Sequence, residues 1–214
     1  MSVAAVVFDL DGVLVDSEQV WDEARRELVS EQGGTWRDDA THAMMGMSSL
    51  EWSRYMHDEL HVGLDPGAIS AAVVEKLERL YRRQLPLLPG AREAVRAVGE
   101  RWPLGLASSS NREIIDLVLD LAGLADAFAA TVSSEEVSRG KPAPDVYLEA
   151  ARQLEVPPDK CAAVEDSTNG LRSAAAAGMY VIAIPNAAFP PSEEALALAN
   201  VVIQSLQELP RTLR

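Results

Sequence analysis

The feature that most constrains the fold is a regular alternation of short apolar runs with helix patterns, which begins at Leu87. The apolar runs are rich in small and β-branched residues, which is typical of buried strands. They cover 3–8 at the start of the chain and then 104–107, 128–132, 161–164, 181–184 and 201–203. Strands that alternate with helices predict an α/β fold, a Rossmann-like doubly wound parallel sheet covered on both faces.

The segment that separates the first apolar run from the others carries helix signals alone. Ser17 is a candidate cap for one helix, Ser48 opens a capping box, and Asp65 precedes a first-turn proline. No convincing strand pattern interrupts this stretch. The expected domains are therefore a core from 1–15 and 87–214 and an inserted all-helical cap over 16–86.

Composition narrows the class of partner. A net charge of -14 argues against nucleic-acid binding, which requires a basic surface. We expect neither a signal peptide nor a membrane-spanning segment, because no apolar run is long enough for a span. The single cysteine, Cys161, excludes an internal disulfide and fits a reducing compartment. We therefore expect a cytoplasmic protein, either a monomer or a weak dimer.

Two carboxylates, Asp9 and Asp11, follow the first apolar run directly. Like charges this close disfavour ionisation unless a cation lies between them or one keeps a proton. An Asx-rich turn is an equally simple explanation of the pattern. A calcium loop of the EF-hand type is excluded, because Gly12 stands fourth from Asp9 whereas that loop places glycine sixth.

Further polar groups follow other strands, and each has an ordinary alternative explanation. Ser108, with Ser109 and Asn111 after it, could simply be part of an ordinary helix cap, and Lys141 could be a solvated charge in a loop. Glu165 and Asp166 could belong to another helix-start signal. In open α/β sheets, however, ligands bind at the carboxyl ends of the strands, where all these groups fall.

Together the groups describe phosphoryl transfer. Carboxylates at strand ends suit Mg²⁺, which prefers oxygen ligands, while a serine hydroxyl, a helix N-terminus and Lys141 suit a phosphate. Asp9 would attack phosphorus to form an aspartyl phosphate. Asp11 would protonate the leaving oxygen and later deprotonate the attacking water. The predicted substrate is a small phosphorylated metabolite.

In these motifs the chain resembles phosphatases of the haloacid dehalogenase (HAD) superfamily that carry a helical cap after the first strand. The resemblance extends over essentially the whole length. The matching residues are Asp9-Leu10-Asp11-Gly12-Val13, Ser108, Gly140-Lys141-Pro142-Ala143-Pro144-Asp145 and Glu165-Asp166-Ser167-Thr168-Asn169-Gly170. The resemblance implies Mg²⁺ as cofactor, with Asp9, Asp11 and Asp166 as ligands and Glu165 at or beside the metal.

Within the superfamily the chain resembles sugar-phosphate phosphatases and the related β-phosphoglucomutase. The resemblance implies that substrate selectivity lies in the cap, at Ser17, Trp21, Gly46, Met47 and Ser48, although Trp21 could simply be cap core. The mutase pattern would have histidine where Trp21 stands and an arginine near Ser49. We therefore predict a phosphatase for sugar or polyol phosphates, with a phosphosugar mutase or a non-catalytic binding protein as alternatives.

Overall fold

The computed structural model describes residues 3–45 and 47–213. Within these ranges six strands form one sheet in the order β3-β2-β1-β4-β5-β6, and every neighbouring pair is parallel. The strands are β1 (Ala5–Phe8), β2 (Leu104–Ser108), β3 (Ala130–Ser133), β4 (Cys161–Glu165), β5 (Tyr180–Ala183) and β6 (Val201–Val202). The prediction of a parallel, doubly wound sheet is confirmed.

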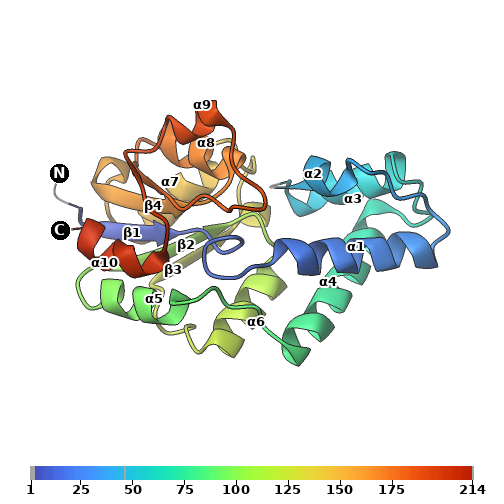
Figure 1. Ribbon diagram of the computed structural model, residues 1–214, viewed down its shortest axis with the longest axis horizontal. Coiled ribbons are helices and arrows are strands. Elements are labelled where there is room, and N and C mark those ends of the chain that lie inside the picture. The colour runs from blue at the N-terminus through green and yellow to red at the C-terminus, as the bar shows by residue number, and fades with distance from the viewer. Residues whose placement is uncertain (1–2, 46, 214) are drawn as a thin grey trace.

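Helices cover both faces of the sheet. Along β1, Val6 and Phe8 pack into one apolar cluster while Ala5 and Val7 pack into the other, because successive side chains point to opposite faces. Figure 1 shows α7, α8 and α9 on one face and α5, α6 and α10 on the other. The core helices are α5 (Ala91–Gly99), α6 (Arg112–Ala122), α7 (Asp145–Gln153), α8 (Thr168–Ala176), α9 (Glu193–Leu196) and α10 (Leu209–Thr212), with 3-10 turns η1 (Ser134–Glu136), η2 (Pro158–Lys160) and η3 (Leu206–Glu208).

Four described helices between β1 and α5 form a separate lobe, which we call the cap (Figure 1). They are α1 (Glu18–Glu31), α2 (Ala40–Met44), α3 (Ser49–Asp58) and α4 (Pro66–Arg83). The capping box is confirmed, since the Ser48 N–H donates to the Glu51 carboxylate at 2.8 Å. Ser17, in contrast, precedes α1 without capping it through its side chain.

The two crossings between core and cap are joined by backbone hydrogen bonds. The Asp16 N–H donates to the Pro86 carbonyl at 2.8 Å, and the Leu88 N–H donates to the Leu14 carbonyl at 2.9 Å. The segments that enter and leave the cap are therefore paired with each other. α1 begins just after the first segment, and α4 ends just before the second.

The strand order fixes where a ligand can bind. From the central β1 the sheet continues to β2 on one side and to β4 on the other. Such a change of direction leaves a crevice at the carboxyl ends of the strands, which is where α/β sheets bind ligands. Among the helices described, none combines the length with the apolar character needed to cross a bilayer.

Candidate active site

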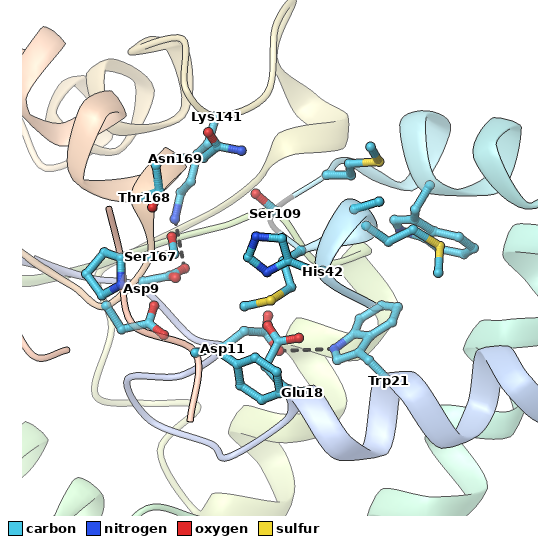
Figure 2. A pocket seen from close by; sticks show the side chains of 18 of the residues that line it. Asp9, Asp11, Glu18, Trp21, His42, Ser109, Lys141, Ser167, Thr168 and Asn169 are labelled. Carbon is cyan, nitrogen blue, oxygen red and sulfur yellow. Dashed lines mark hydrogen bonds and ion pairs between the residues drawn. The ribbon is translucent and has the colours of Figure 1, made fainter. Parts of the chain in front are cut away.

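A cavity of about 400 Å³ lies at this crevice, with walls from both core and cap (Figure 2). From the core it is lined by Asp9, Asp11, Ser109, Ser110, Lys141, Asp166, Ser167, Thr168 and Asn169. From the cap it is lined by Glu18, Trp21, Arg25, His42, Met47 and Trp52, among others. Carboxylates, hydroxyls and a lysine from four separate stretches of the core therefore converge on one space.

Asp9 and Lys141 form a buried ion pair on the core side of the cavity. Lys141 Nζ lies 2.9 Å from Asp9 Oδ1, and both side chains are less than a tenth exposed. Asp9 follows the last residue of β1, whereas Lys141 comes from the loop before α7. A fixed positive charge beside a carboxylate at a strand end is suited to holding an incoming phosphate next to that carboxylate.

Glu165, the last residue of β4, holds Lys141 in place. Its Oε1 accepts hydrogen bonds from Lys141 Nζ at 2.6 Å and from the Tyr147 hydroxyl at 2.9 Å. Its Oε2 accepts from the backbone N–H groups of Asp166 and Ser167 and from the Ser167 hydroxyl. Five donors occupy the lone pairs of this carboxylate, so the contacts of Glu165 suit it to orienting Lys141.

Asp11 is turned away from Asp9 toward α1 and the segment after β2. The indole N–H of Trp21 donates to its Oδ1 at 3.2 Å (Figure 2). The hydroxyls of Ser110 and Ser108 donate to its Oδ2 at 2.6 Å and 3.4 Å. Asp11 is thus oriented from both core and cap, which is what a group that transfers protons at a fixed position requires.

The polar residues at the end of β2 and just after it have different surroundings. Ser109 lines the cavity, and its hydroxyl has no hydrogen-bond partner among the described residues. Ser108 is fully buried and contacts Asp11 instead of lining the cavity. Asn111 donates to the Glu135 carboxylate at 2.8 Å and lies outside this cavity, contrary to its expected place beside the phosphate.

The acidic groups at the strand ends are placed to hold a cation. Carboxylate oxygens of Asp9, Glu165 and Asp166 lie within 4.8 Å of one another, all on buried residues. Asp166 Oδ1 is buried and has no hydrogen-bond partner among the described residues. A Cβ added to Gly12 would lie 1.9 Å from Asp166 Oδ2, so the glycine is needed for this close approach. The donor set fits a divalent metal that prefers oxygen ligands.

The pKa shifts of the buried charged groups also favour a bound cation at this place. Burial raises the pKa of Asp9 to about 8, and the charge of Glu165 adds to this effect while Lys141 opposes it. Burial, with Glu165 and Asp9 nearby, raises the pKa of Asp166 well above its usual value. Burial acts to lower the pKa of Lys141, but the charges of Asp9 and Glu165 outweigh it and the net pKa is raised. A bound cation would offset the repulsion among these carboxylates.

The expected cap residues separate into two groups. Trp21 and Met47 line the cavity, and Trp21 also packs edge-to-face on Trp52 with ring centroids 5.9 Å apart. Ser17 is fully buried, and neither it nor Ser48 lines the cavity. Gly46 lies outside the described residues.

Several cavity residues were not expected from the sequence. Ser110 stands two residues after Ser108 and supplies the shorter hydrogen bond to Asp11. Arg25 follows Trp21 by four residues on α1, so the helical spacing alone could have indicated it. His42 on α2 and Phe189 before α9 belong to segments without a clear helix pattern, and no sequence signal pointed to them.

Comparison with known proteins decides the family. The model of the haloacid dehalogenase-like hydrolases matches residues 3–178. The chain belongs to this family. The match spans β1, the cap and the core through α8, and thus every motif on which the resemblance was predicted.

Two of the similar proteins are named as phosphatases. Hexitol phosphatase B of Escherichia coli is 34% identical over 210 residues, covering 97% of this chain and 94% of the relative. A phosphorylated carbohydrates phosphatase of Thermotoga maritima is 33% identical over 177 residues, covering 82% of each chain. The prediction of a HAD-type phosphoric monoester hydrolase is confirmed as a class.

Solved structures of the family share the whole arrangement. CbbY from Rhodobacter sphaeroides, solved with phosphate, superposes with a TM-score of 0.85 at 26% identity, covering 97% of this chain and 96% of that one. A putative β-phosphoglucomutase from Thermotoga maritima gives a TM-score of 0.76 at 28% identity, covering 98% of both chains.

Proposed function

We propose that this hydrolase is a Mg²⁺-dependent phosphatase that acts on small phosphate monoesters, chiefly sugar or polyol phosphates, through an aspartyl phosphate on Asp9. The observation that supports it most is the buried ion pair of Asp9 with Lys141, 2.9 Å long, on the wall of a cavity shared by core and cap.

Asp9 is the nucleophile of the proposed reaction. One of its oxygens attacks phosphorus, a bond from carboxylate to phosphorus forms, and the bond from phosphorus to the substrate oxygen breaks. Lys141 and the Ser109 hydroxyl, which has no hydrogen-bond partner within the described ranges, bind the phosphate oxygens. The backbone that leads into α6 adds the attraction of a helix N-terminus for an anion.

Asp11 moves the protons. It donates a proton to the leaving alcohol oxygen and then accepts one from the water that attacks the aspartyl phosphate, which releases inorganic phosphate and restores Asp9. The hydrogen bonds from Trp21 and Ser110 keep its carboxylate oriented through both steps.

Asp9, Asp166 and the backbone carbonyl of Asp11 are the groups that would hold Mg²⁺, and Glu165 stands beside them as the group that positions Lys141. When bound, the metal supplies positive charge to the phosphate oxygens. Mg²⁺ is proposed over Ca²⁺ because a small set of carboxylates suits an ion that keeps several waters.

The substrate class is carried over from named relatives, a hexitol phosphatase and a phosphatase of phosphorylated carbohydrates. A cavity of about 400 Å³ has the size of a small-molecule site. We further propose that the cap, residues 16–86, moves about its two crossings to admit substrate. In this proposal the enzyme works in the cytoplasm as a monomer or weak dimer.

A phosphosugar mutase is the alternative, favoured by the superposition on a putative β-phosphoglucomutase. A mutase must protect its aspartyl phosphate from water until the sugar has reoriented. Incubation with β-glucose 1-phosphate and a bisphosphate primer separates the two functions. The phosphatase releases inorganic phosphate, whereas a mutase accumulates glucose 6-phosphate.

The proposed function is tested by phosphate release from a panel of sugar, polyol, nucleotide and glycolate phosphates. We expect turnover with Mg²⁺, none in excess EDTA, recovery when Mg²⁺ is restored, and poor support by Ca²⁺. Full activity in the chelator, or no turnover of any monoester with Mg²⁺, would contradict the proposal.

A further inference from the structure

Arg25 is a buried cation on the cap side of the cavity. Only 6% of its surface is exposed, and its guanidinium lies against two tryptophans, 4.7 Å from the Trp21 ring centroid and 5.1 Å from that of Trp52. It lines the same cavity as Asp9 and Lys141. Contact with both rings restrains the guanidinium, so its position is set before any ligand arrives.

The protein gives this cation no partner of its own among the described residues. Its Nε is buried without a hydrogen bond to any described residue, whereas the buried amines of Lys141 and Lys76 both form close ion pairs. The acidic groups Glu18, Asp11 and Asp22 act on Arg25 only through space, with no hydrogen bond to it. Burying a charge without a partner is costly, which is a reason to expect that a ligand supplies one.

The acidic residues of α1 form no direct ion pair with Arg25 in the part of the chain that the structure describes. Glu18, Trp21 and Arg25 share one face of α1 at i, i+3 and i+7, so Glu18 lies two turns, or about 10 Å, from Arg25 along the axis. The next residue, Arg26, points outward, where it pairs with Asp22. Of the two neighbouring arginines, Arg25 and Arg26, Arg25 therefore faces the cavity.

We propose that Arg25 binds a second anionic group of the substrate, a carboxylate or a phosphate at the end of the molecule far from the phosphate that Asp9 attacks. Sugar acid phosphates and sugar bisphosphates are the substrates with this chemistry. The planar fork of N–H donors matches either anion with two parallel hydrogen bonds. The inference rests on the proposed phosphatase function and specifies which substrates it favours.

Matched substrate pairs test the inference. Glucitol 6-phosphate and 6-phosphogluconate are both open chains that differ in a terminal carboxylate, and fructose 6-phosphate and fructose 1,6-bisphosphate differ in a second phosphate. For each pair we compare kcat/KM in the wild type, in Arg25→Gln and in the control Arg26→Gln. We expect the wild type to prefer the substrate with the second anionic group in at least one pair. That preference should fall about 30-fold or more in Arg25→Gln and stay unchanged in Arg26→Gln. The pair that responds identifies carboxylate or phosphate as the second anion.

A binding measurement keeps the test independent of the folding of the Arg25 variant. In catalytically impaired Asp9→Asn, calorimetry should show tighter binding of 6-phosphogluconate or fructose 1,6-bisphosphate than of its neutral-end partner. Equal affinity within both pairs, or a preference that Arg25→Gln leaves intact, would overturn the inference about Arg25. Turnover of the substrates without a second anionic group would in that case still support the proposed phosphatase function. Absence of turnover with every monoester would instead refute the proposed function itself.

Discussion

The indole N–H of Trp21 in the cap donates a 3.2 Å hydrogen bond to the carboxylate of Asp11 in the core. The same carboxylate accepts from Ser110 at 2.6 Å. One oxygen of Asp11 is therefore oriented by the cap and the other by the core. In the proposed mechanism the position of the cap thereby affects the group that transfers protons, besides enclosing the substrate.

Trp21→Phe tests this connection, because it removes the N–H donor and keeps an aromatic ring against Trp52. A hydrogen bond to a charged group contributes about 1.5–3 kcal/mol, so we expect kcat to fall about 10- to 100-fold. The effect on KM should be smaller, since the ring that lines the cavity remains. Steady-state kinetics with a neutral sugar phosphate measures both.

Trp36→Phe is the matched control. The guanidinium carbon of Arg26 lies 4.4 Å from the Trp36 ring centroid, outside the proposed active-site cavity, and replacement of Trp36 should leave kcat unchanged. If Trp21→Phe behaved like this control, the hydrogen bond to Asp11 would have no part in turnover.

Glu165→Gln tests whether Glu165 positions Lys141. The change removes the negative charge that accepts from Lys141 at 2.6 Å, leaving a buried ammonium with Asp9 as its remaining ion-pair partner. Loss of one partner of a buried pair costs about 3–5 kcal/mol, and we expect a decrease of this size in unfolding free energy together with loss of turnover. Urea denaturation measures the stability.

Glu149→Gln serves as the control for Glu165→Gln. Glu149 pairs with Arg152 at the surface, and losing an exposed pair should cost less than about 1 kcal/mol. Equal stability of the two variants would show that Glu165 does not hold Lys141 in place.

Glu135 joins core and cap away from the catalytic groups. Its Oε1 accepts from the Ser49 hydroxyl at 2.6 Å and from the Asn111 amide at 2.8 Å. We expect Glu135→Ala to favour an open cap, with KM raised about 3- to 10-fold and stability lowered by about 1 kcal/mol. Small-angle scattering would detect the opening, and kinetics the change in KM.

Glu136→Ala is its control, because Glu136 bonds to Arg112 and Ser133 within the core. A rise in KM common to both variants would attribute the effect to the local 3-10 turn instead of the contact with the cap.

The sequence predicted the sheet and most of its helices because periodicity and capping signals are local. α2 (Ala40–Met44) and α9 (Glu193–Leu196) were not predicted, since helices of five and four residues are too short to show an amphipathic repeat. Strand boundaries differ by one or two residues, as at β3 (Ala130–Ser133), where the apolar run starts before the sheet pairing does.

For the site, sequence reasoning found the groups that follow strands. Asp9, Lys141 and Asp166 line one cavity, as expected from their places at strand ends. Asn111 was misplaced because nothing local indicates that its amide reaches Glu135, 24 residues later. Arg25 was missed although it follows Trp21 by one turn of α1, because its second neighbour, Trp52, is on α3 and only the packed cap brings the two together.

Cys161 gives a pH-dependent prediction. Burial raises the pKa of its thiol to about 11, and the charge of Asp159 adds to the effect. The folded thiol keeps its proton where the unfolded thiol, with a pKa near 8.5, loses it. This group therefore stabilises the fold below about pH 8.5, and its contribution is lost as the pH rises through 11.

We accordingly expect the native protein at pH 8 to react with a thiol-specific disulfide reagent far more slowly than the urea-unfolded chain. The rate should rise only at strongly alkaline pH. Rapid labelling of the native protein at pH 8 would contradict the burial of Cys161 at the start of β4.

In the proposed mechanism Asp9 carries the phosphoryl group during turnover, and mass analysis of enzyme quenched in acid during steady-state hydrolysis would detect it there. We expect one phosphoryl group on the peptide that contains Asp9 in the wild type, and neither this adduct nor turnover in Asp9→Asn. A wild-type rate in Asp9→Asn, or a phosphoryl group found on another residue, would contradict it.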